Sequence, residues 1–357
     1  MSSLSSFLDH RFEISAKGSS VKTEVIAGLT TFLTMAYIIA VNPQILSAAG
    51  MDKGALVTAT CLAAALSCAL MGLYANLPLA LASGMGINAF FAFSVCKAMD
   101  VSWKVALAAV FVEGCLFIVL TLTRVREQVV NGIPPSLKIA VSAGIGFFIA
   151  FIGLSNAKIV VSAPKTLVQL GSLSDPRALI ASLGLLVTAL LMHRRIRGAI
   201  LWGILLCTFV AWGYGLYLGA ERAAQFGIFL PEGGIELKSI APIFCQLSFS
   251  GISFFDFFIV ILTLLFVDFF DTVGTLVGVA TKANLLDDKG NFPKARKALL
   301  VDAVGTTFGA VLGVSTVTTY VESAAGIAEG GRSGLTALVT ALLFLLSMFF
   351  APIIMAI

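Results

Sequence analysis

The stretch LPLALASGMGINAFFAF, at residues 77–93, decides the fold of this chain together with a second stretch, STVTTYVESAAGIAEGG, at residues 315–331. Neither stretch reads as one continuous helix. In the first, Ser83 and Gly84 offer a point where a helix can begin after an extended start. The second opens with small and β-branched residues, which favour extended backbone, and turns helix-favouring from Tyr320 onward. Both stretches predict a short extended piece that leads into a half-helix.

The composition places these stretches in a membrane. The 357 residues are 59% hydrophobic and only 12% charged, and the mean hydropathy is +1.01. A typical soluble domain has about 25% charged residues. Such a chain cannot cover its outer surface with polar groups, so the composition excludes a soluble enzyme. The net charge of +4 is small and scattered, which gives no reason to expect a nucleic-acid partner.

Apolar runs predict a multi-pass, all-α membrane protein. Most runs reach the roughly 17 to 25 residues that a helix needs to cross the hydrocarbon. We expect about eleven segments, at residues 25–41, 54–75, 78–96, 101–122, 138–155, 177–192, 198–218, 254–280, 298–313, 315–328 and 335–357.

The distribution of basic residues predicts the orientation of these segments. If every segment crosses and the N-terminus is cytoplasmic, 15 of the 23 Lys and Arg residues lie on the cytoplasmic side and eight on the other side. This excess is what the positive-inside rule predicts. We therefore expect a cell-membrane protein, in the inner or plasma membrane, with its N-terminus in the cytoplasm.

The two broken segments also indicate a function. Non-helical backbone at membrane depth is stable only where protein or a water-filled cavity satisfies its polar groups. A pair of interrupted segments in corresponding parts of a chain is typical of the central site of a transporter. The alternative is that Gly and Pro only allow close helix packing.

Five acidic residues lie inside the expected spans, with no Lys or Arg among them, and acids at this depth are candidates for function. Asp268 and Asp271 are three residues apart, so they share a helix face with Thr272 and Thr275 one turn further on. Two carboxylates this close cannot easily both ionise, which would suit proton coupling. The remaining three are Glu113, for which we expect a buried structural role, Asp302, on a helix rich in small residues, and Glu322, in the first turn of the second half-helix.

An internal repeat is indicated by two offsets. Leu29-Thr30 recur as Leu262-Thr263, 233 residues later, and Asn88 and Glu322 are 234 residues apart. Together with the two breaks, these offsets predict a repeat of seven segments, whose odd number requires opposite orientations in the membrane. A second complete copy would end well beyond residue 357, so we expect the natural protein to continue, and we do not expect transport by the chain as written.

Four motifs resemble the nucleobase-ascorbate transporter family, which includes the xanthine, uracil and vitamin C permeases, and within it the AzgA-like adenine/guanine/hypoxanthine permease branch. They are TxxTMAYIxxVNPxIL at 31–46, GMGxNAFFAF at 84–93, VDFFDTVGTL at 267–276, and the run from Val321 to Gly334. In the last run, Glu322-Ser323 is followed by Gly326, one residue later than the family pattern in the ascorbate and xanthine/uracil branches. This spacing favours the AzgA-like branch.

The resemblance implies a UraA-like fold of fourteen segments in two inverted repeats of seven, with a core domain and a gate domain. Mapped on this chain, a cytoplasmic tail covers residues 1–21. The core would take 22–134 (segments 1–4) and 254–357 (segments 8–11), and the gate 135–253 (segments 5–7). Segments 12–14 of the gate would be absent.

The resemblance also implies proton-coupled purine uptake, with the proton as coupling ion and no other cofactor. By position, the substrate contacts would be Asp271, Glu322, Asn88 and Gly86, with Phe90 stacking on the base. Asp268, Asp302 and Thr275 would support the site or carry the proton. A purine nucleobase and membrane lipid are the expected partners, and a homodimer fits this fold.

Three other functions remain open at this stage. An anion exchanger of the same fold is disfavoured by intramembrane acids with no basic residue beside them. A membrane enzyme could hold Mg²⁺ on Asp268 and Asp271, but we find no second acidic cluster near them. A passive channel would differ from a transporter in failing to accumulate purine.

Overall fold

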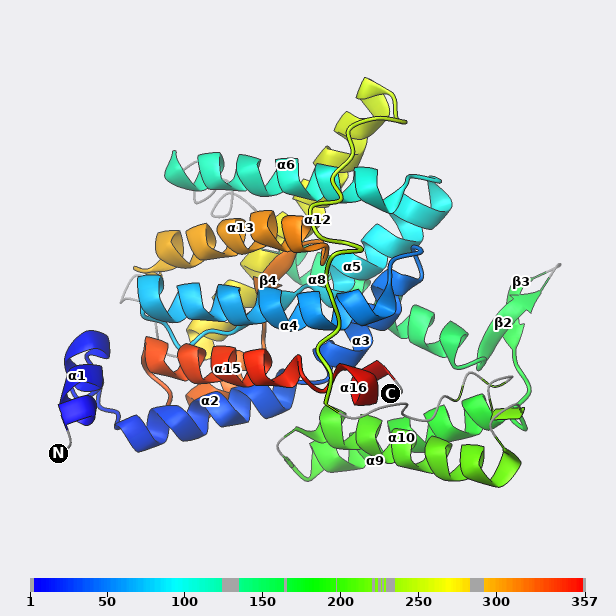
Figure 1. The fold of residues 1–357 in the computed structure, drawn as a ribbon, viewed down its shortest axis with the longest axis horizontal. Helices are drawn as coiled ribbons and strands as arrows, with labels where there is room; N and C mark the ends of the chain where they lie inside the picture. Colours follow the sequence, from blue (N-terminus) through cyan, green and yellow to red (C-terminus); the bar gives the residue numbers. More distant parts are fainter. Residues whose placement is uncertain are drawn as a thin grey trace.

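We describe the fold from a computed structural model, which covers residues 3–123, 135–163, 166–196, 198–219, 222–223, 226, 228, 235–282 and 292–355. Figure 1 shows a bundle of helices with two very short sheets. The helices of the first half are α1 (Ser3–Phe12), α2 (Val21–Met35), α3 (Ile38–Ser47), α4 (Lys53–Leu70), α5 (Met85–Ala89), α6 (Trp103–Leu122), α8 (Pro135–Asn156), α9 (Pro176–His193) and α10 (Ala199–Leu218). The later helices are α12 (Phe254–Lys282), α13 (Ala295–Leu312), α14 (Ser323–Ala328), α15 (Gly334–Ser347) and α16 (Ala351–Met355). Two π-helical turns, η1 (Met71–Ala75) and η2 (Phe90–Ala98), continue α4 and α5, and the strands are β1 (Leu81–Ser83), β2 (Val160–Ala163), β3 (Leu167–Leu170) and β4 (Val317–Thr319).

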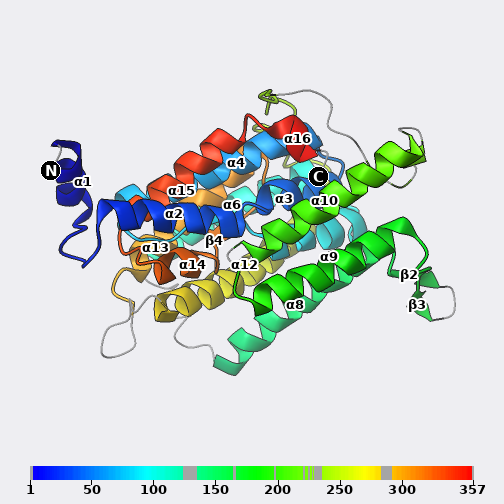
Figure 2. The ribbon, with the colours of Figure 1, turned by 90° about the horizontal axis from the view of Figure 1, so that it is seen from below.

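Six helical stretches in the described part of the chain are long and apolar enough to cross a membrane. Their burial differs sharply. The α4–η1 span is 72% buried within the molecule, whereas the α9 span is 11% buried. In Figure 1, α4 lies between α13 and α15, and α9 and α10 lie side by side at one edge of the bundle. Figure 2 shows the same pair from below, and α8 packs against α12 and α5.

The two broken segments are the structural centre of the bundle, as predicted. Strands β1 and β4 pair antiparallel, with Leu81 opposite Thr319 and Ser83 opposite Val317. Both strands are fully buried. The ladder satisfies their backbone groups at a depth where water cannot, which is the condition for non-helical backbone inside a membrane. Each strand leads into a half-helix, α5 after β1 and α14 after β4.

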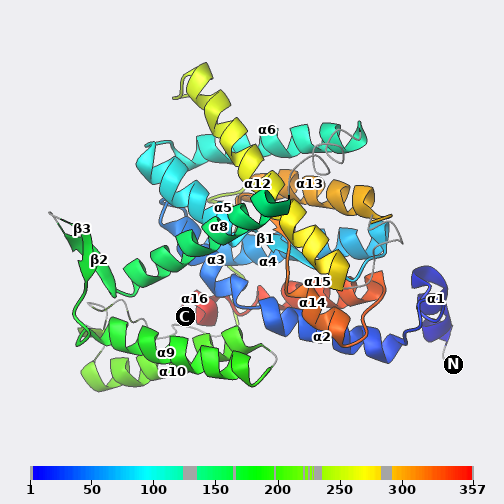
Figure 3. The same ribbon diagram turned by 180° about the vertical axis from the view of Figure 1, so that it is seen from behind.

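Residues of opposite sequence halves complete this ladder. The Gly84 N–H donates to the Thr316 carbonyl (3.0 Å), and the Tyr320 N–H donates to the Ala80 carbonyl (3.0 Å). Because the strands are antiparallel, the half-helices begin at opposite ends of the ladder. Figure 3 shows α12 crossing α6 obliquely, and α12 also contacts β4.

Three details differ from the sequence-based expectation. The second half-helix begins at Ser323, so Glu322 is its N-cap residue and does not lie in its first turn. The single segment expected at 335–357 is broken, because α15 ends at Ser347 and α16 starts at Ala351. Pro352 lacks a backbone N–H, so it suits the first turn of a new helix and cannot continue an old one. The hairpin of β2 and β3 was not anticipated.

The first span is bent. Its two helices, α2 and α3, meet at a turn formed by Ala36 and Tyr37. The bend changes the direction of the chain in the middle of the span. At this bend, Tyr37 points toward the β1–β4 ladder.

Candidate functional site

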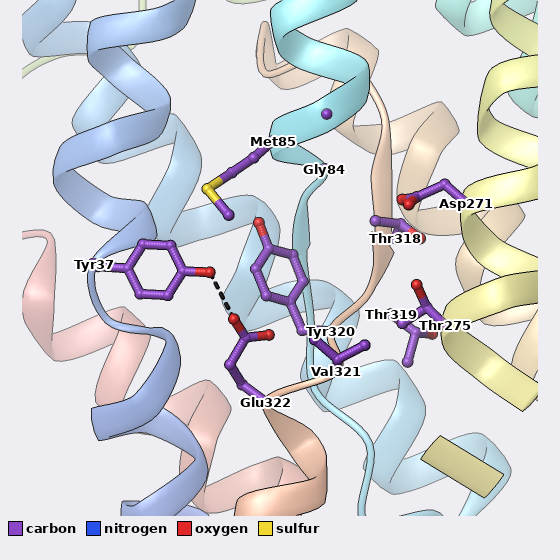
Figure 4. A pocket seen from close by; sticks show the side chains of 11 residues that line it. Tyr37, Gly84, Met85, Asp271, Thr275, Thr318, Thr319, Tyr320, Val321 and Glu322 are labelled. Atoms are coloured by element: carbon purple, nitrogen blue, oxygen red, sulfur yellow. Dashed lines mark hydrogen bonds between the residues drawn. The ribbon is translucent and has the colours of Figure 1, made fainter. Parts of the chain in front are cut away.

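A pocket lies at the ladder between the bent first span and α12. Its volume is about 150 Å³, well below the roughly 300 Å³ at which pockets for drug-sized ligands begin. Figure 4 shows α12 side chains on one side of it and Tyr37 with Met85 on the other. The lining residues of this central pocket are Tyr37, Gly84, Met85, Gly86, Asp271, Thr275, Thr318, Thr319, Tyr320, Val321 and Glu322.

Two carboxylates reach the central pocket from different elements. Asp271 projects from α12, with Thr275 one helical turn further on. Glu322 comes from the start of α14, and its side chain makes no capping bond to that helix. Its Oε1 accepts a 2.6 Å hydrogen bond from the Tyr37 hydroxyl. The α2–α3 bend thus fixes the orientation of one of the two acids.

The floor of the pocket is aromatic and backbone-rich. The Tyr320 ring stands between the two half-helices, and its hydroxyl donates to the Ser83 carbonyl (2.5 Å). Gly84 and Gly86 add backbone without a side chain at the start of α5. The pocket can therefore offer carboxylate acceptors, hydroxyl groups and an aromatic face to a small planar molecule.

Asp268 and Asp302 lie behind the pocket, and neither is among its lining residues. Both are buried, and the Thr272 hydroxyl lies 3.2 Å from Asp268 Oδ1 and 3.2 Å from Asp302 Oδ2. The same hydroxyl is 3.3 Å from Thr318 Oγ1, which lines the pocket. The two acids therefore contact the site through threonine hydroxyls.

Asn88 and Phe90 are not among the residues that line the pocket. Asn88 is fully buried, and its Nδ2 donates to Asn42 Oδ1 and to Ser83 Oγ. It supports the end of β1 from behind. Phe90 packs against the main hydrophobic core. Of the expected substrate contacts, the structure brings together Asp271, Glu322 and Gly86, with Thr275 beside them.

Residues on two other elements were missed by the sequence reading. Tyr37 and Tyr320 both line the pocket, although neither stood out from the apolar stretch around it. The sequence gives only a weak indication of their role. Each is a tyrosine inside an apolar span, where its buried hydroxyl needs a hydrogen-bond partner.

Close backbone contact holds α14 in place. A Cβ built on Gly326 would lie 2.5 Å from the Ala27 carbonyl oxygen of α2 and 2.1 Å from Thr31 Oγ1. Only glycine allows this approach. The position of Glu322, at the head of α14, therefore depends on the packing of α14 against α2.

Comparison with known proteins identifies the family. The model of the Permease family matches residues 22–357. The chain belongs to this permease family. The resemblance drawn from its motifs is confirmed, and this permease is a multi-pass membrane protein and not an enzyme.

Its relatives match it over nearly its whole length. The putative permease MJ0326 of Methanocaldococcus jannaschii is 49% identical over 98% of this chain and 78% of its own length. The guanine/hypoxanthine permease PbuG of Bacillus subtilis is 45% identical (96% and 78%), and the adenine permease AdeP of Escherichia coli is 42% identical (97% and 75%). The permease described here therefore spans about three quarters of the length of these relatives.

Solved structures show the same fold. The transmembrane domain of the cyanobacterial bicarbonate transporter BicA superposes with a TM-score of 0.64 over 94% of this chain and 86% of that domain. The two sequences are 16% identical, so this likeness concerns the fold alone. It confirms the transporter architecture expected from the broken segments.

Proposed function

We propose that this permease imports purine nucleobases by proton symport and binds the base in the central pocket. The observation that carries the proposal is the convergence of Asp271 and Glu322, from separate elements, on one small pocket. The names of the relatives AdeP and PbuG supply the class of substrate, adenine or guanine and hypoxanthine.

The chemistry of a purine suits this lining. Its ring N–H and amino groups are donors, and the two carboxylates are acceptors on different sides of the pocket. We place the planar ring against Tyr320, because aromatic faces stack well on bases. Gly86 lets the base approach the backbone at the start of α5. We assign Asn88 to the support of β1 and leave Phe90 without a contact to the base.

Coupling to protons needs a carboxylate that exchanges its proton during the cycle. Asp271 and Glu322 touch the pocket, and Asp268 and Asp302 lie within reach through Thr272 and Thr318. We propose that one acid of this group carries the proton inward with the base. In this proposal the α9–α10 pair belongs to the gate, against which the core moves to alternate access. A cytoplasmic N-terminus, the inner membrane and a homodimer belong to the same proposal.

Uptake of labelled hypoxanthine, guanine and adenine into cells that lack purine transport tests the function directly, and this and all later uptake measurements use a full-length version of the protein. We expect accumulation of at least one base that a protonophore abolishes. Asp271→Asn and Glu322→Gln should each lower uptake by about 100-fold, since each removes a charge-assisted bond in a buried site. Asp256→Asn, an exposed acid at the start of α12, is the control and should transport normally. Uptake that survives both pocket substitutions would refute the site, and uptake indifferent to the protonophore would refute the coupling.

The other functions considered are not favoured. The likeness to a bicarbonate transporter rests on 16% identity, whereas the permeases of purines are above 40% identical. Net accumulation of purine against its gradient would exclude a passive channel.

A further inference from the structure

The turn that follows α9 carries an arginine in a conformation that normally belongs to glycine. Arg195 has φ of 56°. Its N–H donates to the Met192 carbonyl, and the Ile196 N–H donates to the Leu191 carbonyl, both at 3.0 Å. These two bonds form the Schellman motif, in which the residue occupied here by Arg195 is usually Gly because it must be left-handed. A side chain at this position makes the turn less stable than glycine would.

Arg195 is one of the residues that line a second cavity. This side cavity has a volume of about 430 Å³ and lies between α2, the α9–α10 turn and α14. Arg195 and Ile196 line it on one side, and Val321 and Glu322 on the other. Val321 and Glu322 also line the central pocket. Glu322 therefore stands at the boundary between the two spaces, and Arg195 and Glu322 are the charged residues in the described lining of the side cavity.

The position of the turn is fixed by the first span. Gly198, also left-handed with φ of 67°, begins α10, and a Cβ built on it would lie 3.2 Å from the Leu33 carbonyl oxygen of α2. The turn thus sits on α2, within a helical turn of the bend that carries Tyr37. Close backbone contact therefore holds the turn that carries Arg195 against α2.

A second basic residue, Lys158, has the same left-handed turn conformation as Arg195. The strained turn alone therefore does not indicate a role in transport. Lys158 ends α8 in the same motif, with φ of 61°, and the bonds Lys158 N–H to Ser155 carbonyl and Ile159 N–H to Leu154 carbonyl. It has the same charge and exposed setting as Arg195. Lys158 is not in the lining of the central pocket or of the side cavity. It is therefore a matched control for Arg195.

We propose that Arg195 is a positioning residue for transport, and that the side cavity is the passage by which the central pocket opens toward the α9–α10 turn. Tyr37 bonds to Glu322, and Arg195 shares the lining of the side cavity with Glu322. In the present conformation Glu322 is bonded to Tyr37, and in the opened conformation its carboxylate turns to the Arg195 guanidinium. This exchange of partners frees the base. The proposal rests on the proposed function and names the residue that controls release.

Three variants separate this role from a structural one. Arg195→Gly replaces a strained residue by the one that the motif prefers, so its melting temperature should equal or exceed that of the unmodified protein. Its purine uptake should nevertheless fall about tenfold, the size expected when a hydrogen bond between charged groups is lost. Arg195→Lys should restore most of the uptake, and Lys158→Gly should leave uptake unchanged. If Arg195→Gly transports within twofold of Lys158→Gly, the proposal is wrong.

A second measurement does not depend on purine transport. In a Glu322→Cys variant, we would compare the rates at which anionic and cationic thiosulfonate reagents modify the new cysteine, using the chain without this substitution as background. Arg195 should favour the anionic reagent, and Arg195→Gly should lower the anionic-to-cationic rate ratio about fivefold, in keeping with electrostatic steering. Lys158→Gly should not change the ratio. An unchanged ratio in Arg195→Gly overturns the proposal. A changed ratio, together with no purine uptake by the protein in which Glu322 is intact, would refute the proposed function while supporting the role of Arg195 at the passage.

Discussion

The hydroxyl of Tyr37 donates a 2.6 Å hydrogen bond to Oε1 of Glu322, across 285 positions of the sequence. The bond joins the bend of the first span to the head of α14. It orients a carboxylate that no capping bond holds. The central pocket is therefore assembled by contacts between the bent first span and the second broken segment.

Removing this hydroxyl should weaken the site without unfolding the protein. Tyr37→Phe keeps the ring and loses the bond to Glu322, and a hydrogen bond to a charged group contributes about 1.5–3 kcal/mol. We expect a KM for purine uptake that is roughly ten- to hundredfold higher, with normal expression. Tyr217→Phe, at a position that is 85% exposed, should behave as the unmodified protein. A Tyr37→Phe variant with normal KM would show that Glu322 needs no orientation by Tyr37.

Parts of this site could be predicted from sequence, because they follow from local patterns. The strands at 81–83 and 317–319 come from small and β-branched residues where a helix was interrupted, and the acids at 271 and 322 stood out as charges inside apolar spans. The pairing of β1 with β4 is a long-range contact, which local propensity does not encode.

The absence of Asn88 from the lining of the central pocket has a geometric reason. Successive residues of a helix are about 100° apart, so Asn88 points roughly opposite to Gly86. Phe90 lies on the same side as Gly86 but one turn further from the pocket. We expected Gly86, Asn88 and Phe90 in one site because they belong to one motif. Of these three, only Gly86, at the start of the half-helix, lines the central pocket. Tyr37 was missed because the bend that aims it depends on packing.

A buried carboxylate on the first span fixes the start of α15. Glu24 is fully buried, and its oxygens accept bonds from the Arg332 N–H (2.9 Å), the Ser333 N–H (3.2 Å) and the Thr336 hydroxyl (2.5 Å). An acid at a helix N-terminus satisfies free N–H groups and interacts well with the helix dipole.

Glu24→Gln should therefore destabilise the protein. The substitution replaces one carboxylate oxygen by an NH2 group, which faces the N–H and hydroxyl donors at the start of α15. A buried donor left unpaired costs about 1–3 kcal/mol. Thermal unfolding in detergent should show a melting temperature several degrees lower, about 2–4 °C per kcal/mol for a chain of this size. Glu236→Gln, with a half-exposed side chain, should leave it unchanged. A Glu24→Gln variant as stable as this control would contradict the assignment.

The N-terminal tail contributes a pH-dependent term to stability. Lys17 and Lys294 both approach the Asn76 carbonyl, at 3.3 and 3.4 Å. Burial, and then the charge of Lys294, lower the pKa of Lys17 from 10.5 to about 8. The unfolded chain therefore binds more protons between these two values, and the free energy of unfolding should rise as the pH increases from about 8 to about 10.5.

Lys17→Met tests this term. Near pH 7 the substitution should stabilise the protein by about 1 kcal/mol, a figure reduced for the partial exposure of the side chain. The advantage over the unmodified protein should shrink as the pH approaches 10. Lys22→Met, at an exposed position, is the control. If Lys17→Met and Lys22→Met show the same stability at every pH, the charge of Lys17 costs the folded protein nothing.

Gly326 should be the most sensitive glycine near the site, because α14 and α2 touch through it. In Gly326→Ala the new Cβ would meet the Ala27 carbonyl at 2.5 Å, and backbone cannot rotate away as a side chain can. The half-helix must shift, and Glu322 at its head moves with it, so uptake should fall by at least about tenfold while part of the protein still folds.

Gly278→Ala on α12 is the matched control, since nothing lies within 4 Å of its Cβ position. That substitution should raise stability by roughly 0.5–1 kcal/mol, because alanine loses less backbone entropy than glycine in a helix. Uptake and melting temperature measured on both variants decide the matter, and a fully active Gly326→Ala protein would mean that the placement of Glu322 does not depend on the contact between α14 and α2.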